Sequence, residues 1–123
     1  MASIADRVFD NGLTVLDTEA NKILITSAEA TTYTEANATY ALGNSTTLSI
    51  GAPAARSGGG RQVTIAAITD GSVTATGTAT HYAIVDTTNS RLLATGSLSA
   101  SQAVTSGNTF TLSSAVIGIP GAV

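Results

Sequence analysis

Short segments of β-forming residues recur along this chain and constrain its fold more than any other feature. Val, Ile, Thr and Tyr gather in runs that return about every ten residues, and turn residues such as Gly, Asn and Asp separate these runs. Beyond residue 12 we find no apolar spacing typical of a second helix. The pattern predicts an all-β fold, either an antiparallel β-sandwich or a small barrel.

The clearest predicted hairpin joins residues 80–86 to residues 91–97 through a loop of Asp, Thr, Asn and Ser. Residues 51–60 include Pro53 and a run of glycines, which predicts a flexible loop. Residues 115–123 are expected to be an extended apolar tail. The other predicted strands are 13–17 and 22–26 around a turn at 18–21, then 31–36, 38–42, 46–50, 61–68, 69–86 with a bend at Gly77, and 108–114.

The one helical signal lies at the start of the chain. Ser3 and Asp6 match a capping pattern, and Ile4 and Val8 have the spacing of one helix face. These residues predict a short helix over residues 3–10, which the following Asn-Gly pair ends. A helix this short is unstable alone in water, so it must pack either on the chain's own sheet or, as an interaction arm, on another subunit.

We therefore predict two parts, a helix or arm over residues 1–12 and a single β domain over residues 13–123. Aromatic residues make up only 4% of the chain, so the core is expected to be thin and to benefit from neighbouring subunits. Charged residues make up 11%, against roughly 25% in an average soluble protein, which suits a surface that packs against other proteins. The composition thus favours a homo-oligomer.

Composition also argues against several classes of protein. The net charge of −3 leaves no basic surface for a nucleic acid. The absence of cysteine removes disulfides, thiolate catalysis and zinc fingers. We see neither a secretion signal nor an apolar run long enough to span a membrane, so we expect a product made in the cytoplasm and no membrane partner.

His81 and Asp86 are the first candidates for catalysis. In a strand, their odd and even positions place the two side chains on opposite faces, about 17 Å apart along the strand. They therefore cannot form a catalytic pair, which needs hydrogen-bond distance. We interpret His81 as structural and Asp86 as a loop residue that lies near Arg91 across the mouth of the hairpin.

Other candidates have equally simple structural explanations. The segment between Arg56 and Arg61 lacks the phosphate-binding loop pattern, and we interpret it as a mobile loop or as a grip for an acidic partner. Tyr33 and Tyr40 could stack on a sugar or pack across strands. The carboxylates are scattered, with no metal-binding spacing. We predict no catalytic, cofactor-binding or metal-binding residue, no cofactor, and no enzymatic activity.

Two segments, ADRVFDNGLTVLDTEANKILITSAEATTYTEA at residues 5–36 and GTATHYAIVDTTNSRLLATGSLSASQAVTSGNTFTL at residues 77–112, resemble a group of small tailed-bacteriophage and prophage proteins. The resemblance extends to about residue 119. It implies a small β-rich structural protein of the virion, present in many copies. It supplies no catalytic residues.

Within that setting we predict a head decoration or accessory protein that stabilises the capsid through protein–protein contacts, although the resemblance itself does not distinguish head from neck or tail. The expected partners are the major capsid protein or other virion proteins and further copies of the chain, and the expected location is the virion. A neck or tail component, or a receptor- or carbohydrate-binding module of a tail tip, stays open as an alternative. The predicted interface residues are Ile4, Val8, Phe9, Val116, Ile117 and Ile119.

Overall fold

The computed structural model describes residues 5–119. Their contacts divide the chain into two compact units. The helix unit contains residues 5–19, 49–67 and 113–119 of the described chain, and the sheet unit contains residues 20–48 and 68–112. Neither unit is a continuous segment, so the predicted division at residue 12 does not follow these units. Strands dominate both, and the predicted all-β, antiparallel class with an N-terminal helix is confirmed.

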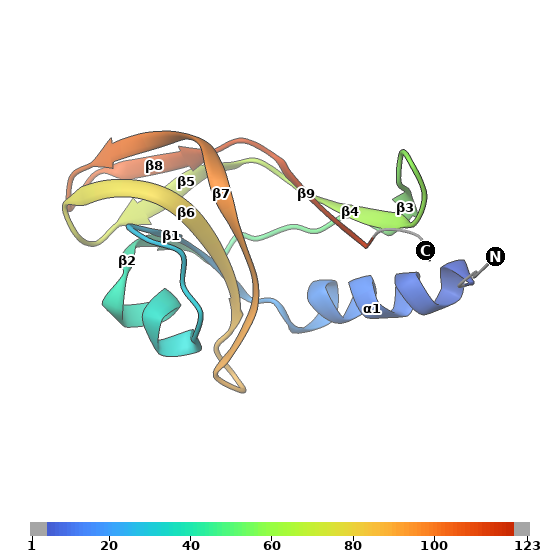
Figure 1. The fold of residues 1–123 in the computed structure, drawn as a ribbon. Helices are drawn as coiled ribbons and strands as arrows, with labels where there is room; N and C mark the ends of the chain where they lie inside the picture. Colours follow the sequence, from blue (N-terminus) through green and yellow to red (C-terminus); the bar gives the residue numbers. More distant parts are fainter. Residues whose placement is uncertain (1–4, 120–123) are drawn as a thin grey trace. The chain divides into compact units, whose positions relative to one another are not determined.

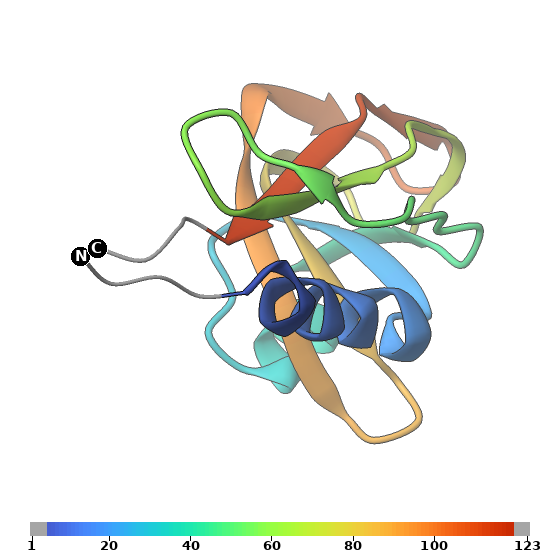
Figure 2. The same ribbon diagram turned by 90° about the vertical axis from the view of Figure 1, so that its right-hand side faces the viewer.

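The helix unit combines one helix with a small antiparallel sheet (Figure 2). The helix is α1 (Asp6–Glu19), and the sheet has the order β3–β4–β9. Its strands are β3 (Ala54–Ala55), β4 (Arg61–Ile65) and β9 (Ala115–Ile119). Because β4 pairs on both sides, β9 is an edge strand of this sheet.

The helix α1 extends well past the predicted end. Phe9, Leu13 and Leu16 are buried, and their spacing of four and three residues gives the helix one apolar face. The prediction of a strand over residues 13–17 was therefore wrong, because this face outweighs both the local apolar run and the Asn-Gly stop signal. The predicted capping residue Ser3 and the interface residue Ile4 lie outside the described residues.

The sheet unit is a curled antiparallel sheet (Figure 1). Its strand order is β7–β6–β1–β2–β5–β8, so the longest strand, β7, lies at one edge and the short strand β8 at the other. This curvature agrees with the predicted sandwich or small barrel. The strands are β1 (Lys22–Thr26), β2 (Ala41–Ser45), β5 (Ile68–Val73), β6 (Gly77–Asp86), β7 (Arg91–Val104) and β8 (Thr109–Leu112).

The predicted hairpin is the longest strand pair in the sheet. β6 and β7 pair from Asp86 and Arg91 at the loop to Gly77 and Val104 at the far end. The register shifts at two places along this pair, so the irregularities lie inside it and not at Gly77, where β6 begins. β1 pairs with β6 and β2, and not with the predicted partner at residues 13–17.

A helical turn replaces the strand predicted over residues 31–36 and the start of the one predicted over residues 38–42, whose last two residues begin β2. It is a π-helical turn, η1 (Glu35–Thr39), whose register is set by the bond from the Tyr40 N–H to the Glu35 carbonyl. The Glu35 carboxylate accepts bonds from the Thr31 N–H and hydroxyl, and the Thr32 hydroxyl accepts from the Glu35 N–H. This reciprocal capping favours the turn over an extended strand.

Three further boundaries differ from the prediction. The strand predicted over residues 61–68 is divided at Ala66 and Ala67 into β4 and β5, which belong to different sheets. The strand predicted over residues 46–50 contributes a single bridge between Ile50 and Ile65. The loop predicted over residues 51–60 contains β3 and an ordered turn.

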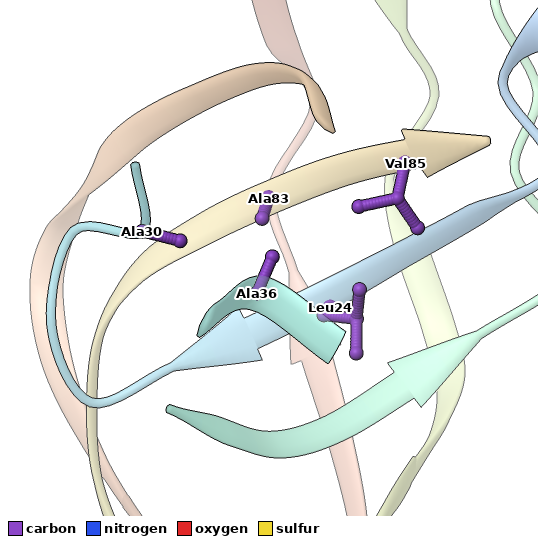
Figure 3. Packing of buried hydrophobic residues seen from close by; sticks show 5 residues of the cluster. All are labelled: Leu24, Ala30, Ala36, Ala83 and Val85. Carbon is purple, nitrogen blue, oxygen red and sulfur yellow. The ribbon is translucent and has the colours of Figure 1, made fainter. Parts of the chain in front are cut away.

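A small apolar cluster fills the space between η1 and the sheet (Figure 3). Ala36 on η1 points toward Ala83 on β6 and Leu24 on β1, and all three are buried. The small alanines let the helical turn approach the strands closely. None of the helices in the described part of the chain has the length and apolar character needed to cross a membrane.

Candidate interaction surface

His81 and Asp86 have separate partners, in agreement with the predicted geometry. The Nδ1 atom of His81 lies 2.8 Å from the hydroxyl of Thr80. β6 runs in continuous register with β1 from His81 to Val85, so odd and even positions keep opposite faces. Asp86 bonds within its own loop. Nothing in this arrangement couples the imidazole to a carboxylate.

The Asp86 carboxylate organises the β6–β7 loop. Although Asp86 is buried, it accepts bonds from the Asn89 side-chain amide at 2.8 Å and from the Thr88 N–H at 2.9 Å. The Asn89 bond contributes most to holding the pKa of Asp86 below its ordinary value, and the charge of Arg91 acts in the same direction. These contacts make Asp86 the residue that orders this turn.

Arg61 is committed to an ion pair inside the helix unit. Its Nε donates to the Asp10 carboxylate at 2.8 Å, and its second nitrogen donates to the other oxygen at 3.3 Å. This paired geometry joins β4 to α1. The sequence could not indicate the pair, because Asp10 and Arg61 are far apart along the chain.

The segment from Arg56 to Arg61 forms a closed turn and not a phosphate cradle. The Arg56 N–H bonds to the Gly60 carbonyl, and its guanidinium donates to the Gly59 carbonyl at 3.1 Å. Gly58, Gly59 and Gly60 all have positive φ, which glycine adopts without a steric penalty. The prediction of a mobile loop gives way to a defined turn between β3 and β4.

Tyr33 and Tyr40 pack against the apolar cluster beside η1. Both are partly buried, so part of each ring stabilises the fold. Packing was one of the two predicted explanations, although the contacts come from a helical turn and not from paired strands. Sugar binding by these residues stays a prediction.

Neither a metal-binding cluster nor an unpaired buried polar side-chain atom is present among the described residues. Among residues 5–119 no group of three or more His, Asp or Glu side chains is placed to hold a metal ion. Within the same residues, every buried side-chain nitrogen and oxygen has a hydrogen-bond partner. No buried polar atom is therefore left to mark a ligand.

Exposed apolar side chains are concentrated in the helix unit. The large ones among the described residues are Val8 at 62% exposure, Val116 at 54% and Val15 at 45%. Val8 and Val15 lie on α1, and Val116 lies on β9. We call Val8, Val15 and β9 the apolar surface of the helix unit.

The predicted interface residues do not share one environment. Phe9 is only 6% exposed and belongs to the core, whereas Val8 and Val116 face solvent. Ile117 and Ile119 are half-buried. The prediction missed Val15, because residues 13–17 were interpreted as a strand; the seven-residue spacing from Val8 would have indicated it.

Helical spacing places the exposed valines on the side of α1 next to β9. Val8, Gly12 and Val15 follow each other at intervals of four and three residues, so they share one side of the helix. A Cβ atom added at Gly12 would lie 3.6 Å from the Ile119 side chain on β9. Asp10, which binds Arg61, lies on the other side. Val8 and Val15 therefore lie beside β9, whereas the Val116 side chain, which alternates with Ile117 and Ile119, points to the face of the small sheet away from α1.

Comparisons of the chain with protein-family models, with curated proteins and with solved structures found no match.

Proposed function

We propose that this chain is a structural, non-enzymatic component of a bacteriophage particle, which decorates the head and stabilises it through protein–protein contacts. The resemblance of residues 5–36 and 77–112 to small phage proteins supplies the setting. The observation that carries the proposal is the apolar surface of the helix unit, which exposes Val8 and Val15 on α1 and Val116 on the other face of the small sheet, since exposed large apolar side chains mark interaction sites.

The chemistry of the chain supports contacts with protein. With few charged residues, the surface can be buried against a neighbour at a small desolvation cost. The ionisable side chains described above hold turns, strands and the helix, as Asp86, Glu35 and the Asp10–Arg61 pair do. The partners we propose are the major capsid protein and other copies of this chain.

Copy number in purified particles tests this function. Particles produced from the genome that encodes the chain are analysed by quantitative mass spectrometry against the major capsid protein. We expect the chain in numbers comparable with the capsid protein. A few copies per particle would place it in the neck or tail, which is the alternative, and its absence from particles would overturn the proposal.

A substitution test addresses the surface itself. The double variant Val8→Ser with Val15→Ser should lose binding to particles in a sedimentation assay. Thr14→Ala with Thr18→Ala is the matched control at other exposed positions of α1 and should bind normally. Equal binding by both double variants would exclude this helix face. Substitution is sharper than deleting residues 1–10, which would also remove buried Phe9.

A further inference from the structure

The edge strand β9 lacks the features that keep sheet edges from pairing. Residues 115–119 contain no charged residue and no proline, and β9 pairs with β4 along one side. Natural proteins commonly protect such edges with lysine, proline or a bulge. An unprotected edge presents free backbone groups to a further strand.

The pairing pattern shows which backbone groups face outward from β9. The Thr64 carbonyl accepts a bond from the Gly51 N–H, so Thr64 directs its backbone groups away from β9. Alternation along β4 then turns the backbone groups of Val63 toward β9, where its partner is Ile117. The backbone groups of Ile117 therefore point to β4, and those of Val116 and Gly118 point to the side of β9 on which no strand of the described residues lies.

We propose that β9 pairs with β9 of a second copy of this chain, antiparallel and centred on Ile117. In this register Val116 lies opposite Gly118 of the second copy, and Gly118 opposite Val116. In both pairs the backbone groups of the two residues face each other. Each pair then forms two hydrogen bonds, which gives about four in all. Centring the strands on Val116 or Gly118 would bring together a single such pair. The small sheets of the two copies then form one continuous sheet.

The side chains fit this register. Val116, which is 54% exposed, is placed beside a residue without a side chain. The space over Gly118 is bordered by the Arg56 side chain, since a Cβ added at Gly118 would lie 2.9 Å from Arg56 Cδ. The valine of one copy can thus pack on the aliphatic part of Arg56 of the other.

The choice of a second copy as the occupant follows from charge and symmetry. β9, Val8 and Val15 are uncharged, so the paired strands bring no like charges together, and Arg56 of each copy lies beside Gly118, opposite the uncharged Val116 of the other copy. A basic partner would find no acidic group on this strand. Two-fold symmetry also places the two α1 helices antiparallel to each other on the same face of the joined sheet. Val8 and Val15 lie on the side of each helix that is next to β9.

The dimer adds self-association to the proposed function. Its role in the particle rests on that function, whereas pairing in solution does not. Sedimentation equilibrium of the full-length chain in solution should show a concentration-dependent dimer. Val116→Pro removes an outward N–H at an edge position that tolerates proline, and it should give a monomer with an unchanged circular dichroism spectrum. A wild-type chain that stays monomeric, or a folded Val116→Pro chain that still dimerises, overturns the inference.

Charge substitutions provide a second test if Val116→Pro does not fold. Val116→Lys should also give a monomer. The matched control, Thr64→Lys, puts the same charge on the exposed partner of Val116 in β4, away from the edge, and should leave the dimer intact. Equal effects of the two lysines, or no effect of either, would contradict pairing at β9.

A cysteine variant tests the register. The chain has no cysteine, and the two Ile117 residues form a non-hydrogen-bonded pair with Cα atoms about 4.5 Å apart, within disulfide range. Ile117→Cys should form a covalent dimer rapidly on mild oxidation, and Val116→Cys more slowly. The reverse order excludes this register. A dimer in solution that is not incorporated into particles would support the inference and overturn the proposed function. Monomers bound to particles would overturn the inference and support the proposed function.

Discussion

The side-chain amide of Gln102 on β7 donates a hydrogen bond of 3.0 Å to the backbone carbonyl of Thr111 on β8. These strands are the two edges of the six-stranded sheet, so the bond bridges the open sides of the curled sheet. The turn between them is also anchored, because the Ser106 hydroxyl donates to the Thr74 carbonyl. A side chain thus links edges that form no backbone ladder with each other.

Removing this bridge should loosen the edges without unfolding the sheet. Gln102→Ala is expected to lower the free energy of unfolding by about 0.5–1.5 kcal/mol, because one hydrogen bond at the surface is lost. Chemical denaturation measures the change, and hydrogen exchange should rise selectively in β7 and β8. Ser101→Ala is the control at the neighbouring exposed position. Equal effects of the two variants would show that the bond does not hold the edges.

The parts of the fold that local residues determine were predictable. The β6–β7 hairpin was predicted because its loop chemistry and its apolar strands adjoin in the sequence. Curling depends on pairs such as β2 with β5 and β5 with β8, whose partners are distant in sequence, so no local pattern indicated it. Residues 13–17 were ambiguous, because a short apolar run fits either a strand or a helix until packing decides.

The Phe110 ring covers Gly43 and Gly71, and this close approach should make both glycines sensitive to substitution. A Cβ atom at Gly71, the cross-strand partner of Phe110, would overlap the ring. The ring is only 3% exposed and has little room to move. Gly71→Ala is therefore expected to lower the free energy of unfolding by about 1–3 kcal/mol through overpacking.

The control for this prediction is a glycine with room for a side chain. A Cβ at Gly51 would meet its nearest neighbour, the Thr64 carbonyl oxygen, at an ordinary 3.6 Å. Gly51→Ala should change stability by less than about 0.5 kcal/mol, as most surface substitutions do. Thermal unfolding of both variants decides the matter, and similar melting temperatures would refute the role assigned to the Phe110 ring.

Asp86 should make the stability of the chain depend on pH in the acidic range. The Asn89 side chain and the loop amides lower the pKa of Asp86 in the folded state. The stabilisation is therefore fully present above the ordinary carboxyl pKa of about 4 and is lost as the pH falls through the lower, folded-state pKa. Asp86→Asn keeps a carbonyl oxygen to accept the Thr88 N–H but does not titrate.

Denaturation curves at several pH values test this dependence. The stability difference between the wild type and Asp86→Asn should be largest near neutral pH and shrink as the solution becomes more acidic. Glu35 also has a lowered pKa, chiefly from the Thr31 hydroxyl, so Glu35→Gln should remove a separate part of the acid sensitivity. A constant difference between wild type and Asp86→Asn across the acidic range would contradict the assigned role of the carboxylate.

The candidate surface was only partly predictable, because neighbouring residues in a helix can have opposite environments. Val8 and Phe9 were predicted together as interface residues, yet one faces solvent and the other the core. Spacing indicates which residues share a side, but the sheet that α1 packs against determines which side is buried. That information lies in β4, which contacts α1 from a distant part of the sequence.

Adjacent substitutions on α1 should therefore have different consequences. Phe9→Ala is expected to lower the free energy of unfolding by about 3–5 kcal/mol, because it removes a buried ring and leaves a cavity. Val8→Ala should alter stability by no more than about 0.5 kcal/mol, since the side chain is mostly in water. Chemical denaturation at a concentration where the chain is monomeric separates folding from self-association. If Val8→Ala proved as destabilising as Phe9→Ala, the orientation of α1 on the small sheet would be wrong, and with it the apolar surface beside β9.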